Sequence, residues 1–212
     1  MQTETKSLLS DELLSELAER GDLRSYPRGE ILIQEGEQSD ALYILIAGRV
    51  KIFTRDERGR ELIYNVLSAG EYFGEMFLDG GSRSASAKAV TAVECVLVGP
   101  EAFRGFLNTY PEFAESLVLT LIARVRHATQ QIRSLALSGV YERTVQLLNR
   151  LAVDEDGARM LPVAMTQQEM AERIGATREM VNQIMQGLVR GGFLSRAGDR
   201  RLVIAKELPK QW

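Results

Sequence analysis

Short apolar segments punctuated by glycines fill the chain between residues 31 and 98. Leu42, Ile44 and Ile46 alternate with their neighbours, which is the period of a strand with one buried face. The residues at 56–60, Asp-Glu-Arg-Gly-Arg, separate two strand candidates as a hairpin turn would. This pattern predicts roughly eight short strands packed as a roll or barrel.

Helical spacing is found on both sides of this strand region. A cap at Ser10 followed by apolar positions up to Leu17 predicts a short helix over one end of the roll. Gly139 is expected to end a second, long helix or to form a hinge after it. After Pro111, this long helix carries six apolar positions at heptad a/d spacing: Val118, Leu121, Val125, Ala128, Ile132 and Leu135.

The narrow apolar stripe on the long helix leaves two interpretations open. The stripe docks on the chain's own roll, or it pairs with the same stripe of a second copy. Arginines and glutamines occupy the other faces of the helix. A stripe this narrow is the coiled-coil form rather than the broader form that faces a globular core. The pattern therefore favours a parallel homodimer seam.

The C-terminal region carries the pattern of two short helices joined by a tight turn. Thr166 and Glu169 have the spacing of a capping box that starts the first helix. Gly175 supplies the turn, and Thr177 can cap the second helix. Strand candidates follow within 193–204, so the segment predicts a helix-turn-helix with a β-hairpin wing.

The exposed residues at the start of the second helix enter the major groove in such a unit. Here they are Arg178, Glu179, Asn182 and Gln183. Arginine can donate two hydrogen bonds to guanine, glutamate can accept one from cytosine N4, and glutamine can pair with adenine or serve a looser role. These residue types suit the reading of DNA bases.

Composition and charge are those of an ordinary globular protein. The 212 residues, 45% of them hydrophobic, can form one large core or two modest ones. The net charge is −3, with 11 Lys+Arg against 9 Asp+Glu over 139–212 and 15 against 20 before that. This small basic excess permits a local DNA-facing surface. The apolar stretches are too short to span a bilayer and the N-terminus has no signal-peptide core, so a cytoplasmic protein without membrane contact is expected.

The segment 168–181, QEMAERIGATREMV, resembles the winged helix-turn-helix signature of the cAMP receptor protein/FNR (Crp/Fnr) family. Stretches at 27–30, 36–37, 46–50 and 70–75 resemble that family's cyclic-nucleotide-binding β-roll, so the resemblance covers nearly the whole chain. It implies an α+β fold. An N-terminal cyclic-nucleotide-binding-type β-roll over 1–110, a dimerisation helix over 111–138 and a C-terminal winged helix-turn-helix over 139–212 are expected.

The resemblance also implies a homodimeric transcription regulator that binds double-stranded palindromic DNA, with RNA polymerase as a partner if it is an activator. Arg178 and Glu179 would then read a G and a C in each half-site, while Thr166, Gln168 and Thr177 contact phosphates. Members that respond to cAMP commonly carry a second arginine where this chain has Gln183. That departure implies a different preference at one base pair of the operator.

The stretch 74–85 combines a turn, a carboxylate, small residues and an arginine, which suit a ribose cyclic phosphate. Gly74 can expose backbone N–H groups, Arg83 can fork onto phosphate oxygens, Ser84 can donate, and Glu75 can accept from a ribose 2′-hydroxyl. By the resemblance, the effector is cAMP or a related cyclic nucleotide. The long-helix position that often offers a threonine to the adenine in this family is Ala128 here, and the neighbouring Thr129 is expected to reach the base instead. The loop is a residue or two shorter than in typical cAMP-binding members. Three alternatives to a cyclic mononucleotide therefore remain: another small ligand, a cyclic dinucleotide, or a pocket that has no ligand.

Other chemistries find little support in the sequence. An iron–sulfur cluster needs several cysteines, and the chain has only Cys95, in an apolar run. The lone His127 fits a partly packed surface residue better than a haem ligand. No metal-ligand cluster, nucleophile elbow or His/Cys pair is found, so neither a metal site nor an enzyme is expected. A cyclic-nucleotide-binding interaction module without DNA binding is the alternative from another class.

Overall fold

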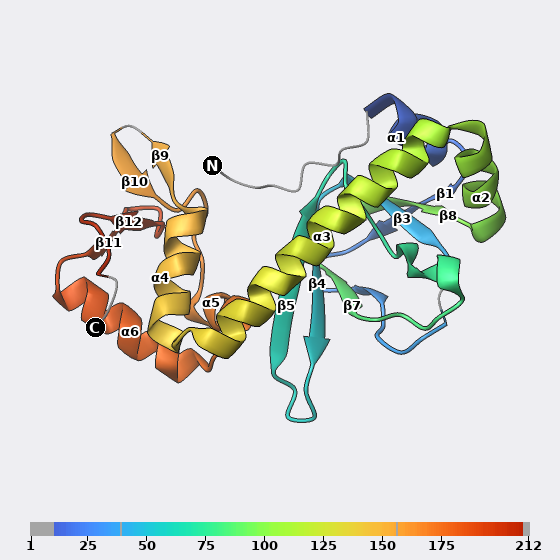
Figure 1. Ribbon diagram of the computed structural model, residues 1–212. Coiled ribbons are helices and arrows are strands. Elements are labelled where there is room, and N and C mark those ends of the chain that lie inside the picture. The colour runs from blue at the N-terminus through green and yellow to red at the C-terminus, as the bar shows by residue number, and fades with distance from the viewer. Residues whose placement is uncertain (1–10, 39, 156, 210–212) are drawn as a thin grey trace. The chain divides into compact units, whose positions relative to one another are not determined.

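The structure, a computed structural model, describes residues 11–38, 40–155 and 157–209 (Figure 1). These residues form two compact units. One comprises the described residues up to Asp56 together with Ile63–Ala128, and the other comprises Glu57–Leu62 and the described residues from Thr129 onward. Among the described residues, no helix is both long enough and apolar enough to cross a membrane.

The first unit contains a roll of two four-stranded antiparallel sheets. The prediction of an eight-stranded roll is thus confirmed, and the expected turn at 56–60 separates β4 from β5. One sheet has the order β1 (Asp22–Tyr26), β8 (Val93–Val98), β3 (Leu42–Ala47) and β6 (Tyr72–Phe73). The other has the order β2 (Ile31–Ile33), β7 (Ser86–Ala89), β4 (Arg49–Arg55) and β5 (Glu61–Ser68).

Helices close one end of the roll. The short helix α1 (Asp11–Ala18) forms as predicted, although its expected cap, Ser10, lies outside the described residues. Helix α2 (Pro100–Thr109) is not among the predicted elements. Phe103 and Phe106 of α2 are fully buried and make edge-to-face contacts with Phe113, at ring-centroid distances of 5.9 and 5.0 Å. These rings join the helical layer to the sheet in one hydrophobic cluster.

The long helix α3 (Pro111–Leu137) begins at the predicted proline. The helix breaks after Leu137, at the expected position of a hinge, and Gly139, with φ −66 and ψ 163, is the N-cap of the next helix, α4 (Val140–Leu151). Its backbone N–H donates to the Glu142 carboxylate, so the chain starts a new helix here rather than making a left-handed C-cap.

The expected seam positions on α3 divide into two kinds. Leu121 is partly buried against the core of the roll. The other five are exposed in the single chain, and two further large apolar residues near them, Leu119 and Ile122, are also exposed. The five are Val118, Val125, Ala128, Ile132 and Leu135.

The second unit contains α4, α5 (Gln167–Ile174) and α6 (Arg178–Arg190), which pack on a four-stranded sheet. The sheet has the order β11 (Leu194–Arg196), β12 (Leu202–Ile204), β10 (Ala158–Met160) and β9 (Val153–Glu155). The hairpin of β11 and β12 is the expected wing. Strands β9 and β10 were not predicted, although an Asp-Gly turn signal at 156–157 precedes β10.

Cys95 is fully buried in the roll, and burial raises the pKa of its thiol from 9.0 to about 12. Because the thiolate is the reactive form, we expect native Cys95 to react with a thiol reagent at pH 8 at least tenfold more slowly than the urea-unfolded chain. Between about pH 9 and pH 12 the thiol ionises in the unfolded chain but stays protonated in the folded one. Ionisation stabilises the unfolded state, so the contribution of Cys95 to the free energy of unfolding is lost as the pH rises through this window. Reaction rates with and without urea test the prediction, and equal rates would contradict it.

Candidate effector-binding and DNA-binding sites

The loop after β6 turns sharply at Gly74 and enters a 3₁₀ helix, η1 (Glu75–Asp79), which ends at Gly80. Both glycines have left-handed backbone conformations, with φ 84 and φ 75. A Cβ atom on Gly74 would lie 2.7 Å from Nη1 of Arg83 and 3.1 Å from the carbonyl oxygen of Ala41. Gly74 is therefore needed for its conformation and for the close approach of Arg83.

Arg83 is buried, with 5% of its surface exposed. Its Nη1 donates to the Gly74 carbonyl at 2.9 Å, and its Nη2 donates to the Ala41 carbonyl at 3.0 Å and to Asp40 Oδ1 at 3.2 Å. These bonds use three of the five N–H groups of a guanidinium. Among the described residues, Asp40 is the only carboxylate that pairs with Arg83. Its side chain is 83% exposed and so lies largely in solvent.

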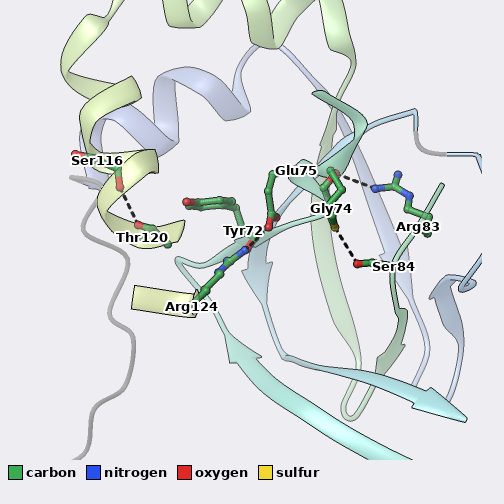
Figure 2. Close-up of polar contacts among 9 residues, drawn as sticks. Tyr72, Gly74, Glu75, Arg83, Ser84, Ser116, Thr120 and Arg124 are labelled. Atoms are coloured by element: carbon green, nitrogen blue, oxygen red, sulfur yellow. Dashed lines mark hydrogen bonds and ion pairs between the residues drawn. The ribbon is translucent and has the colours of Figure 1, made fainter. Parts of the chain in front are cut away.

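Glu75 faces the long helix rather than Arg83 (Figure 2). Its Oε1 accepts from Nη1 of Arg124 at 2.8 Å, and Nη2 of Arg124 donates to the Tyr72 carbonyl at 2.6 Å. The Arg124 guanidinium also lies 4.9 Å from the centre of the Tyr72 ring. Sequence reasoning assigned Arg124 only to the polar face of the helix. The available signal was its place on the same helix as Thr129, five residues before it.

The loop thus brings four of the five expected effector residues together. Ser84 is next to Arg83, and its hydroxyl contacts the Met76 sulfur at 2.9 Å (Figure 2). The fifth, Thr129, lies on α3 and belongs to the other compact unit. Its role in effector binding stays a prediction.

The helix-turn-helix begins with the predicted capping box. The Thr166 hydroxyl accepts from the Glu169 backbone N–H at 3.1 Å, and the Glu169 carboxylate accepts from the Thr166 backbone N–H at 2.7 Å. The Thr177 hydroxyl caps α6 by accepting from the Met180 backbone N–H. Both threonines expected at phosphates therefore also fix the start of a helix.

The turn between α5 and α6 is held against the end of α3. Gly175 is left-handed at φ 63, and a Cβ atom there would lie 2.9 Å from Cδ2 of Leu135. Arg143, in the first turn of α4, donates to the Ser138 carbonyl at 2.7 Å and to the Gly175 carbonyl at 3.4 Å. Neither Arg143 nor this contact was foreseen, because a lone arginine in a polar run carries no sequence signal.

Of the four expected base-reading residues, Arg178, Glu179 and Gln183 are exposed on α6. Asn182 is half-buried, and its Oδ1 accepts from Nε2 of Gln167 and from Nε2 of Gln186. Gln168, the remaining expected phosphate contact, is exposed and donates to Glu172.

Two family models match the two parts of this architecture. The cyclic nucleotide-binding domain matches residues 23–110, and the Crp-like helix-turn-helix domain matches residues 142–208. A nucleotide-binding type of roll, a long helix and a helix-turn-helix together define the class of ligand-sensing transcription regulators.

Similar proteins narrow the class to one family. The chain is 33% identical over 187 residues to a CRP-like cAMP-activated global transcriptional regulator of Mycobacterium tuberculosis, and the match covers 86% of this chain and 84% of that protein. A cAMP-activated global transcriptional regulator of Haemophilus influenzae is 32% identical over 171 residues, which are 78% of this chain and 76% of that one. The chain belongs to the CRP/FNR family of DNA-binding transcription regulators.

A solved structure supports the fold. The c-di-GMP responsive global regulator CLP of Xanthomonas campestris superposes with a TM-score of 0.81 at 24% identity, over 93% of this chain and 100% of that chain. The expected α+β architecture, with its β-roll and C-terminal helix-turn-helix, is confirmed.

Replacing Gly74 by alanine tests the packing of Arg83, with Gly80→Ala as a matched control. Both changes introduce left-handed strain of about 1–2 kcal/mol. Only the Gly74 change also displaces the buried guanidinium, which adds about 1–3 kcal/mol. A Cβ atom on Gly80 would meet no atom within 4 Å. We expect Gly74→Ala to lower the free energy of unfolding clearly more than Gly80→Ala in urea titrations. Equal losses would contradict the close approach.

Proposed function

We propose that this chain is a homodimeric transcription regulator whose affinity for palindromic DNA is controlled by a cyclic nucleotide, with cAMP as the first candidate. The observation that carries the effector assignment is the environment of Arg83. Its guanidinium is buried, and its carboxylate partner Asp40 is largely solvated. A buried cation with so weak a counter-charge favours a bound anion, and a cyclic phosphate supplies one.

The other loop residues have complementary roles in this proposal. Ser84 donates to a phosphate oxygen after leaving the Met76 sulfur, and Gly74 lets the backbone approach the ligand. Glu75 accepts from the ribose 2′-hydroxyl while it remains bonded to Arg124. Thr129 contacts the base from α3. The effector thus binds a carboxylate that is already attached to the long helix, which supports control through α3.

The exposed apolar side chains of α3 support the proposed dimer. Val118, Val125 and Ile132 are 53%, 65% and 66% exposed, and they repeat at the spacing of a helical seam. Exposed isoleucine and valine on a helix are stabilised when a second copy covers them. In a two-fold dimer, two α6 helices about 34 Å apart occupy successive major grooves of a palindrome. The effector shifts the pair of seam helices toward the register that gives this spacing.

The DNA-contacting residues follow the sequence expectation. Arg178 reads guanine and Glu179 reads cytosine, while Gln183 acts where cAMP-responsive relatives commonly carry arginine. Thr166, Gln168 and Thr177 contact phosphates. If the protein activates transcription, we expect it to contact RNA polymerase directly. The cytoplasmic location stays a prediction from the sequence. We propose no catalytic activity.

A second effector class is favoured by one observation. The structurally similar protein of Xanthomonas campestris is described as c-di-GMP responsive. A cyclic dinucleotide offers the same anionic phosphate to Arg83, so the same buried cation supports it. The two classes differ in size and in the number of bases, and direct competition separates them.

Selection from a randomised palindromic DNA library tests the proposed function. We expect the purified protein to enrich one palindrome, and to do so at least tenfold more strongly with one of cAMP, cGMP or c-di-GMP than without, at fixed salt. Equal enrichment without any nucleotide would contradict the effector assignment and keep the DNA-binding role. No enrichment under any condition would contradict both.

The seam is tested by Ile132→Glu, with Gln130→Glu as the control on the same helix. A glutamate at a seam position places two like charges together and removes two buried isoleucines, each worth about 1.5–3 kcal/mol. We expect the dimer dissociation constant to rise about a hundredfold or more for Ile132→Glu and to change little for the control. Sedimentation equilibrium measures it, and equal dimerisation by both variants would contradict the seam.

A further inference from the structure

Asn182 lies one turn after Arg178 on α6, so the two side chains share a helix face. Its Oδ1 atom accepts two hydrogen bonds. Nε2 of Gln167, the first residue of α5, donates at 3.0 Å, and Nε2 of Gln186, one turn further along α6, donates at 3.4 Å. Both helices thus fix the orientation of a single amide.

These two bonds change what Asn182 can recognise. Asparagine singles out adenine by donating to N7 and accepting from N6–H at the same time. An amide oxygen has two lone pairs, and both are engaged here. Only Nδ2, a donor, remains for a base edge.

We propose that Asn182 is a donor-only specificity residue. Guanine presents two acceptors in the major groove and thymine presents O4, whereas cytosine presents only a donor. Asn182 can therefore donate to guanine, thymine or N7 of adenine, disfavours cytosine, and gives adenine no bidentate advantage. The inference rests on the proposed placement of α6 in the major groove.

Gln167 and Gln186 influence specificity indirectly, because they position the Asn182 amide. Removing both donors frees Oδ1, and the complete adenine pairing becomes available. The double variant Gln167→Leu/Gln186→Leu keeps side chains of similar size and removes only the amide groups. Gln146→Leu, an exposed glutamine on α4, is the matched control.

The experiment compares base preferences from library selection by four proteins: wild type, Asn182→Ala, the double variant and the control. We expect the wild type to deplete cytosine at one position of each half-site, and Asn182→Ala to flatten the preference there and nowhere else. The double variant is expected to raise adenine at that position by about fivefold or more, the lower end of what a bidentate pair contributes. The control is expected to match the wild type.

Four outcomes would overturn the inference. A wild type that already selects adenine at the Asn182-dependent position would show that Oδ1 is available to the base. An Asn182→Ala variant with unchanged preferences at every position would leave Asn182 as a contact between α5 and α6 only. A double variant that gains no adenine would show that the two glutamines do not withhold Oδ1 from the base. A wild type that selects no sequence would overturn the proposed placement of α6 itself, which distinguishes that failure from the other three.

Discussion

The contact of the Arg124 guanidinium with Glu75 and Tyr72 holds the loop after β6 on the long helix α3. The guanidinium binds the Glu75 carboxylate and the Tyr72 carbonyl at once, and it lies over the Tyr72 ring. The Arg124 and Glu75 side chains are only 25% and 16% exposed, so solvent screens this ion pair less than a surface pair. The loop after β6, which contains Glu75, therefore cannot move away from α3 without separating two partly desolvated charges. A ligand that binds Glu75, as proposed, would therefore contact a carboxylate that is bonded to α3.

The end of α3 has a corresponding attachment in the other unit. A Cβ atom on Gly175 would lie 2.9 Å from Cδ2 of Leu135, and Arg143 donates to carbonyl groups at Ser138 and Gly175. The turn before the recognition helix is therefore fastened to the last turns of α3 within one compact unit. In the proposed mechanism, these contacts are the route by which a rotation of the last turns of α3 would reach α6.

Much of the fold was predictable because it depends on local sequence patterns. Strand alternation, the heptad spacing after Pro111 and the capping box at Thr166 depend on residues a few positions apart, and all three predicted elements are present. The pairing of Glu75 with Arg124 spans 49 positions, and that of Gln167 with Asn182 spans 15. Such contacts depend on tertiary packing, which one sequence does not encode as a pattern. The break after α3 was expected at Gly139, but the glycine caps the start of α4 rather than the end of α3, because a glycine can serve at either end of a helix.

The charge of the chain bears on how the proposed DNA complex gains its binding free energy. The chain carries a net charge of −3, and Arg201 of the wing is already paired with Glu155 and Asp199. Counterion release from phosphates therefore supplies less binding free energy than in a strongly basic protein. Under the proposed placement of α6, selectivity depends on a few oriented side chains, and the orientation of Asn182 is set by neighbouring amides. In the proposed dimer, the same limited electrostatic attraction would make binding sensitive to the spacing of the two recognition helices, which is the quantity that an effector acting through α3 would change.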